Sequence, residues 1–172
     1  MMGWALIART PLIEVTHDER CLRAARAIRD DIQDVVDRTG TYDQEGMNYG
    51  LGTVLTGLGN LHRVTGDEAA LKLMLRIMDW HIEHRRNAVG IVWGDQLRPY
   101  SLNLTLPAYA YAYWATGERK YLEEGLRLFS FTGPPGDTSH VRSAGKQYRT
   151  FMPFLKLAHE AGALDDMERR MR

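Results

Sequence analysis

The sequence contains one cysteine, Cys21, and no long apolar run. A lone thiol cannot form an internal disulfide, which fits a reducing compartment and favours a cytoplasmic location. No stretch approaches the roughly 18 apolar residues that a membrane-spanning helix needs. The N-terminal segment MMGWALIARTPL lacks the basic region that precedes the apolar part of a signal peptide. We therefore expect neither a secretion signal nor a membrane partner.

An excess of charge of one sign is also missing. Lys plus Arg number 22 and Asp plus Glu number 22, so the formal net charge is zero. Nucleic-acid binders need basic residues that neutralise phosphates, and this balance argues against such a partner. With 172 residues, 44% of them hydrophobic and 26% charged, the chain is typical of a globular protein. We predict a single domain over residues 1–172.

Alternating runs of β-branched residues are absent, whereas apolar residues recur at helical spacing. The segment LTLPAYAYAYWA is apolar nearly all round, as in a helix packed on most sides, and its Pro107 fits a first helical turn. We predict an all-α fold. The predicted apolar stripes are Leu22–Ala25–Ile28–Ile32–Val35–Val36, Leu51–Val54–Leu55–Leu58–Leu61, Leu71–Met74–Leu75–Met78–Ile82, Tyr121–Leu122–Leu126–Phe129 and Phe151–Phe154–Leu155–Ala158.

A short motif recurs between these helices. TGDEAAL around Gly66 matches TGERKYL around Gly117, AGALDD places Gly162 in the same position, and THDERCL places His17 there. The four positions are 49, 51 and 45 residues apart. A left-handed glycine ends a helix, and an acidic residue after it favours the start of the next. The motif therefore predicts tight corners in a repeat of antiparallel helical hairpins.

The connections between hairpins are much longer than the corners. They cover residues 38–50, 87–103 and 132–149, and we call them the first, second and third links. In an antiparallel helical array, alternate connections lie at opposite ends, so all three links are expected at one end and all the corners at the other. Long connections within a compact domain are usually functional.

Hairpins of about 50 residues with these corners and one elaborated face resemble the α/α-toroid proteins, the six-hairpin glycosidase-like superfamily. The resemblance covers the chain from Thr16 onward and implies inner and outer rings of helices, with a carbohydrate cleft on the face of the links. It implies a carbohydrate substrate and no cofactor. About three hairpins are present instead of six. Three alternatives follow: an open partial array, a truncated product, or one part of an assembly such as a homo-oligomer or a larger toroid.

The first link contains two carboxylates and two aromatic residues. Asp43 and Glu45 could act as acid, base or nucleophile, because glycoside hydrolysis uses a pair of carboxyl groups. Tyr42 and Tyr49 could stack on a sugar ring. The alternative is that these acids are ordinary surface residues.

The second link, NAVGIVWGDQLRPYSLN, is the strongest candidate. Trp93 and Tyr100 are unusual in a solvated loop unless they pack or bind a ligand. Asp95 lies between them, in a setting that favours a raised pKa, and Arg98 could pair with it or with a ligand carboxylate. We predict Asp95 as the catalytic acid or base. The alternative is that Trp93 plugs the link onto the core while Asp95 caps a turn.

The third link concentrates basic and titratable residues just before a helix. Arg142 and Arg149 could bind an anionic substituent such as a uronate. His140 or Tyr148 could act as the base of a lyase beside a carboxylate that arginine neutralises. The alternative is a solvated basic loop.

Other residues carry weaker signals. His81 and His84 have no partner at a zinc-site spacing, so no metal site is predicted. The glycines of GLGTVLTGLG lack the features of a phosphate loop and indicate close helix packing. Two functions remain open. One is a glycoside hydrolase or polysaccharide lyase that acts on an oligosaccharide, with acidic oligosaccharides included among the candidate substrates. The other is a non-catalytic helical scaffold that binds a protein.

Overall fold

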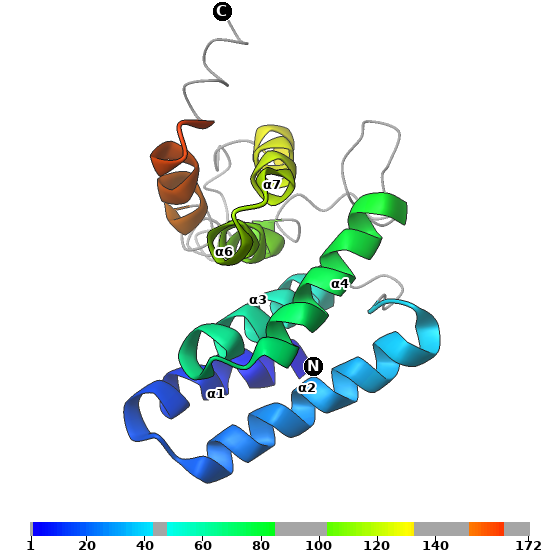
Figure 1. Cartoon of the computed structure of the whole chain (residues 1–172), viewed down its shortest axis with the longest axis vertical. Helices are drawn as coiled ribbons and strands as arrows, with labels where there is room; N and C mark the ends of the chain where they lie inside the picture. Colours follow the sequence, from blue (N-terminus) through cyan, green and yellow to red (C-terminus); the bar gives the residue numbers. More distant parts are fainter. Residues whose placement is uncertain (1, 43–47, 85–102, 133–151, 164–172) are drawn as a thin grey trace, which may run out of the picture. The chain divides into compact units, whose positions relative to one another are not determined.

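The computed structural model describes residues 2–42, 48–84, 103–132 and 152–163 (Figure 1). Within these ranges all regular structure is helical and no strand occurs, so the all-α prediction is confirmed. The chain divides into two compact units, Met1–Leu97 and Arg98–Arg172. The helices are α1 (Met2–Thr16), α2 (Glu19–Thr39), α3 (Asn48–Thr65), α4 (Glu68–His84), the 3₁₀ helix η1 (Asn103–Thr105), α6 (Leu106–Thr116) and α7 (Arg119–Thr132), and residues 152–160 are helical as well.

The predicted corners are present at all four positions. His17, Gly66, Gly117 and Gly162 have positive φ angles of 52°, 70°, 71° and 69°. At His17, Gly66 and Gly117 the backbone N–H donates to the carbonyl four residues earlier, at 2.9, 2.7 and 2.7 Å. This is the left-handed helix end that the sequence motif predicts, and the histidine adopts it as the glycines do.

The threonine before each of the first three corners also has a defined role. The hydroxyls of Thr16, Thr65 and Thr116 donate to the carbonyl four residues earlier, at 2.6, 2.7 and 2.7 Å. Two of them also accept from the next helix: Thr16 from the Asp18 N–H at 3.3 Å and Thr116 from the Glu118 N–H at 3.1 Å. Each of these two threonines thus links the end of one helix to the start of the next.

In the first unit, α1 and α3 are parallel neighbours. Gly3 lies against the backbone of Val54, and Glu14 forms an ion pair with Arg63 at 3.0 Å. The Glu14–Arg63 pair is 49 residues apart in sequence, which equals the spacing of the corners at 17 and 66. Equivalent positions of successive repeats therefore lie side by side, and the corners after α1 and α3 are at the same end.

Glycine allows α1 and α3 to approach closely. A Cβ atom on Gly57 would lie 2.7 Å from the Leu6 Cβ and 3.1 Å from the Gly3 carbonyl oxygen. Distances this short are incompatible with a side chain at position 57. The predicted packing role of this glycine is therefore confirmed.

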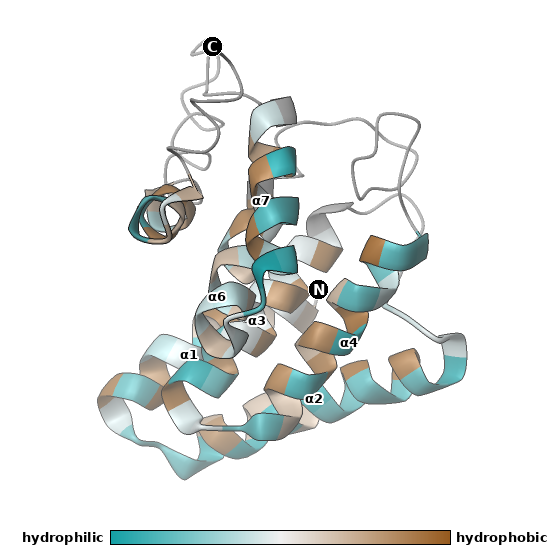
Figure 2. Cartoon of the chain, turned by 45° about the horizontal axis from the view of Figure 1, so that its top comes forward, coloured by the Kyte–Doolittle hydropathy of each residue, from teal (hydrophilic) through white to brown (hydrophobic). Residues whose placement is uncertain are grey.

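Helix α2 is amphipathic, with a narrow apolar stripe on a polar helix (Figure 2). Its stripe buries Ala25, Ile32 and Val36, which the sequence predicted. Both predicted stripes are wider than the buried faces, because Leu22, Ile28 and Val35 of α2 and Leu71, Leu75 and Ile82 of α4 are only partly buried. The buried face of α4 is rotated toward Ala70, Leu73, Met74, Ile77, Met78 and His81.

Helix α1 contains Pro11 in its interior. A proline has no N–H for the carbonyl four residues earlier, which here belongs to Ile7. The buried Thr10 hydroxyl donates to that carbonyl at 3.3 Å and replaces the missing bond. The helix is apolar nearly all round, and Leu12 and Val15 remain 52% and 79% exposed.

In the second unit, Pro107 occupies the first turn of α6, as predicted. Helix α6 packs against α7, and the core includes Tyr109 and Tyr121. Phe154 is fully buried and its ring lies where a Cβ of Gly125 would be. This contact joins residues 152–160 to α7. None of the helices within the described ranges is long and apolar enough to cross a membrane.

Candidate active site

Nearly all of the predicted site residues lie outside the described residues. Tyr49 belongs to the first turn of α3, but its side chain is also outside them. The described residues do include the start of the first link and the end of α4, which precedes the second link in the sequence. The predicted residues outside the described ranges are Asp43, Glu45, Trp93, Asp95, Arg98, Tyr100, His140, Arg142, Tyr148 and Arg149.

The first link leaves α2 through a left-handed glycine. Gly40 has a φ of 84°, and its N–H donates to the Val36 carbonyl at 2.8 Å. The next two residues, Thr41 and Tyr42, are buried. Tyr42 is only 2% exposed, so its ring belongs to the core and is not available to stack on a sugar. This part of the stacking hypothesis is wrong.

A contact between α4 and this segment brings the starts of two links together. The Nε2 atom of His81 lies 3.4 Å from the Tyr42 carbonyl oxygen, and both residues are buried. Tyr42 immediately precedes Asp43. Helix α4 ends at His84, three residues after His81, and the second link follows. The residue before Asp43 and the last turn of α4 therefore lie next to each other.

Aromatic contacts surround the last turn of α4. The Trp80 ring meets the His81 ring edge-on, with centroids 5.1 Å apart and planes at 78°. It stacks on His84 at 4.8 Å and 18°, and His84 Nδ1 lies 2.9 Å from the Trp80 carbonyl oxygen. The sequence did not lead us to predict this cluster. The feature that could have predicted it is the phase of the α4 stripe, in which His81 follows Ile77 and Met78 at helical spacing.

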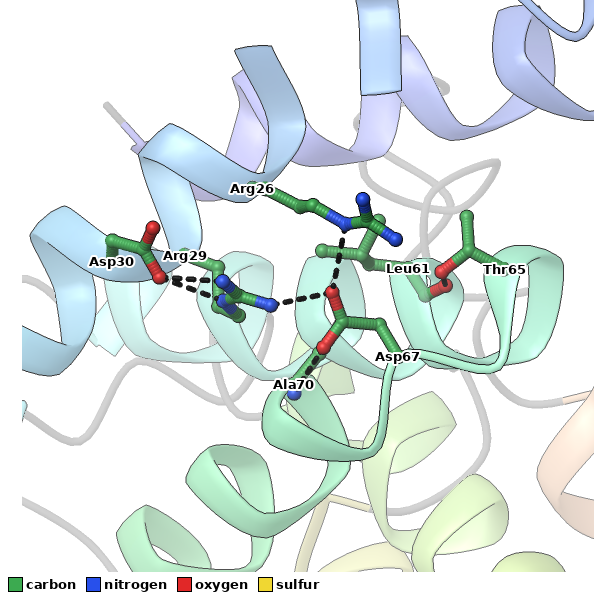
Figure 3. A network of polar contacts seen from close by, with 7 residues as sticks. All are labelled: Arg26, Arg29, Asp30, Leu61, Thr65, Asp67 and Ala70. Atoms are coloured by element: carbon green, nitrogen blue, oxygen red, sulfur yellow. Dashed lines mark hydrogen bonds and ion pairs between the residues drawn. The ribbon is translucent and has the colours of Figure 1, made fainter. Parts of the chain in front are cut away.

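The corner end of the first unit contains a different cluster (Figure 3). Asp67 accepts from Arg29 at 2.5 Å and from the Ala70 N–H at 3.1 Å, and Arg26 Nε lies 3.5 Å away. Burial raises the pKa of Asp67, but these hydrogen bonds and the nearby guanidinium charges outweigh it, so the pKa lies below its usual value. A carboxylate held ionised in this way caps α4 and cannot serve as a proton donor near neutral pH.

Metal ligands were not predicted from the sequence. Among the described residues, no group of three or more His, Cys, Asp or Glu side chains is arranged to hold a metal ion. Cys21 lies on α2 as a free, partly buried thiol.

In the first unit, the tight corners that follow α1 and α3 lie at one end, and the segment ending at Tyr42 meets the end of α4 at the other. Residues 23–155 match the family model described as the beta-L-arabinofuranosidase, GH127 catalytic domain. The chain belongs to this family of α/α-toroid glycosidases, so the predicted superfamily and fold class are confirmed. Glycoside hydrolase chemistry and a carbohydrate substrate follow from the family. No curated protein and no solved structure matches the sequence.

Proposed function

We propose that this chain hydrolyses the glycosidic bond of an L-arabinofuranoside with catalytic residues supplied by its links. The observation that carries the proposal is the family match over residues 23–155, because that range includes the predicted acids of the first two links and the basic residues of the third. The printed family description supplies the sugar. The arrangement of the first unit supports the place of the cleft.

The contact between His81 and Tyr42 supports a shared cleft. It holds the residue before Asp43 against the last turn of the helix that leads to Asp95. Since α1 and α3 are parallel, the corners of the first unit lie at the opposite end from these starting points. Two carboxylates from different links can then approach one glycosidic bond.

Hydrolysis assigns a role to each carboxyl group. As general acid, Asp95 donates its proton to the glycosidic oxygen while the bond from the sugar C1 to that oxygen breaks. The second carboxylate, from Asp43 or Glu45, either removes a proton from the attacking water or bonds to C1 before water releases the sugar. Trp93, Tyr100 and Tyr49 provide faces on which a sugar ring can stack, with Tyr42 excluded by its burial.

The third link suggests a substrate that carries negative charge. Arg142 and Arg149 would bind an acidic substituent beside the bond that is cleaved, and Arg98 would provide further positive charge. His140 and Tyr148 are close in sequence to Arg142 and Arg149. They would orient the acidic substituent by hydrogen bonds. An acidic branched oligosaccharide with terminal arabinofuranose is the substrate class that uses all three links.

Purified protein incubated with 4-nitrophenyl β-L-arabinofuranoside, its α-anomer and an acidic arabinose-containing oligosaccharide tests the proposal. Asp95→Asn should lower kcat by about 10²–10⁴-fold without changing the melting temperature, as loss of a general acid does. Asp34→Asn, an exposed acid on α2, serves as the matched control. Release of an unsaturated uronate would indicate a lyase instead. Absence of turnover with every substrate would favour the non-catalytic scaffold.

A further inference from the structure

We propose that His81 is a positioning residue that fixes the start of the first link against the end of α4. The proposal concerns a contact between described residues, and only its kinetic consequence rests on the proposed function. His81 would touch neither substrate nor reacting atoms. It would act through the Tyr42 backbone, which it holds directly before Asp43.

The contact belongs to a series that sets the register of α2 against α4. Arg76 donates to Asp37 at 2.6 Å across a sequence separation of 39 residues. His81 and Tyr42 are also separated by 39 residues, five positions further along each segment. Whereas Asp37 and Arg76 are exposed, Tyr42 and His81 are 2% and 6% exposed. Of these two contacts, the one between His81 and Tyr42 is therefore shielded from water.

The chemistry of this contact fixes the tautomer of the histidine. A backbone carbonyl only accepts, so the His81 Nε2 must carry the hydrogen. Because the Tyr42 residue is buried, water cannot easily replace this donor. Glutamine can present an amide N–H near the same place, whereas leucine fills similar space without a donor. The two substitutions therefore separate hydrogen bonding from packing.

Thr41 provides a control at the same place in the fold. Its hydroxyl is buried and has no hydrogen-bond partner in the described part of the chain. Thr41→Val removes this hydroxyl with little change of shape and leaves the Tyr42 carbonyl and His81 untouched. Thr41→Val lies next to the contact between His81 and Tyr42 but does not break it. This variant should therefore behave as wild type.

Amide hydrogen exchange on the full chain tests the positioning directly. Exchange of the amides of residues 40–42 should rise on the order of tenfold in His81→Leu and stay near wild type in His81→Gln and Thr41→Val. Thermal melting of each variant confirms that it is folded. Unchanged exchange in His81→Leu overturns the proposal. An equal rise in the leucine and glutamine variants also overturns it, since packing alone would then explain the effect.

Kinetics add a second readout. His81→Leu should lower kcat on the order of tenfold with KM within about twofold, because a displaced catalytic group slows chemistry more than binding. His81→Gln should recover most of that loss. His62→Leu, at the corner end near Glu68, should change stability without changing kcat. If the wild type hydrolyses no glycoside, the proposed function fails, and the exchange measurement still decides the role of His81.

Discussion

At the scale of single residues, the four corner positions share one backbone conformation but not one residue type. Three are glycine and the fourth is His17, which adopts a φ of 52°. The left-handed region costs a residue with a side chain about 1–2 kcal/mol relative to glycine. The corner after α1 therefore carries strain that the other corners avoid.

This difference predicts opposite effects at equivalent positions. Gly66→Val should lower the free energy of unfolding by more than about 1 kcal/mol. A Cβ on Gly66 has no atom within 4 Å, so backbone strain is the only cost. His17→Gly should raise the unfolding free energy slightly, or leave it unchanged. Urea unfolding of both variants measures this, and a Gly66→Val protein as stable as wild type would contradict it.

Asp67 makes stability depend on acid pH. Folding lowers the pKa of Asp67 below 3.8, so its charge stabilises the fold at pH values above 3.8. This stabilisation disappears as the pH falls through the lower pKa of the folded state. Asp67→Asn keeps an acceptor for the Ala70 N–H but loses the charge. The substitution should lower the free energy of unfolding by about 1.5–3 kcal/mol at pH 7, the usual range for hydrogen bonds to charged groups.

Measuring the unfolding free energy of wild type and Asp67→Asn from pH 7 to pH 2 checks this result. The two curves should converge as the pH falls through the folded pKa of Asp67, which lies below 3.8, because wild-type Asp67 then becomes protonated. Asp30→Asn is the control, because Asp30 also pairs with Arg29 but is exposed. It should cost less than about 1 kcal/mol. Curves that stay parallel at every pH would show that Asp67 acts by shape alone.

Residue-scale features differed in how far the sequence could predict them. The corners were predictable, including His17, since a local motif repeats at nearly constant spacing. The pairing of Arg29 with Asp67 was not, because it joins residues 38 apart in sequence and depends on helix packing. His81 was missed because a lone histidine in an apolar stripe resembles an ordinary core residue until its partner is known.

At the scale of helices, the contact between α1 and α3 depends on the absence of side chains at Gly3 and Gly57. Alanine is the better helix former by about 1 kcal/mol, so an isolated helix would gain from Gly57→Ala. Here the new Cβ meets Leu6 and the Gly3 carbonyl. Close packing therefore outweighs helix propensity at this position.

Gly57→Ala should thus lower the free energy of unfolding by about 1–3 kcal/mol, the usual cost of overpacking. Denaturant unfolding measures the loss. Ala27→Gly on the exposed side of α2 is the control that measures helix propensity in the same fold, and it should cost about 1 kcal/mol. A Gly57→Ala protein more stable than wild type would mean that α1 and α3 separate without cost.

Helix existence was predictable because apolar periodicity is a local property. The phase of the α4 stripe was partly wrong because Leu71, Leu75 and Ile82 compete with Ala70, Leu73 and Ile77 for the buried face. Hydrophobicity alone does not separate these two sets, because leucine and isoleucine occur in both. The choice is made by the neighbouring helices, whose positions a single sequence does not give.

At the scale of the whole molecule, apolar surface remains exposed near the first residues of the chain and at Met152. Leu12 and Val15 lie on α1, whose two charged side chains are already engaged: Arg9 donates to the Ala5 carbonyl, and Glu14 pairs with Arg63. Exposed apolar side chains such as these favour association.

We expect the protein to self-associate in a concentration-dependent way. Sedimentation velocity should show a dimer or higher oligomer at high concentration, and the double variant Leu12→Lys, Val15→Lys should shift it toward monomer. Ala27→Lys, on the charged side of α2, is the matched control and should leave association unchanged. A wild type that stays monomeric at every concentration would contradict the expectation.

The candidate site was predictable only as a location. Repeat spacing predicts which segments are links, and chemistry suggests which of their residues could act. Neither one fixes how Asp95, Asp43 and Glu45 lie relative to one another. Those distances depend on contacts like the one between His81 and Tyr42, which join parts of the chain that no local pattern connects.

The left-handed corners have a consequence for how such a chain can evolve. Each corner turns through one residue whose N–H is already bonded, so an inserted residue there would break the bonds that join two helices. The register of the helices is fixed by contacts such as Glu14–Arg63 and Asp37–Arg76, not by the number of residues between α2 and α3. Insertions and deletions should therefore accumulate in the links and be purged from the corners. New substrate ranges could then be acquired by changes in link length while the helical scaffold is inherited intact.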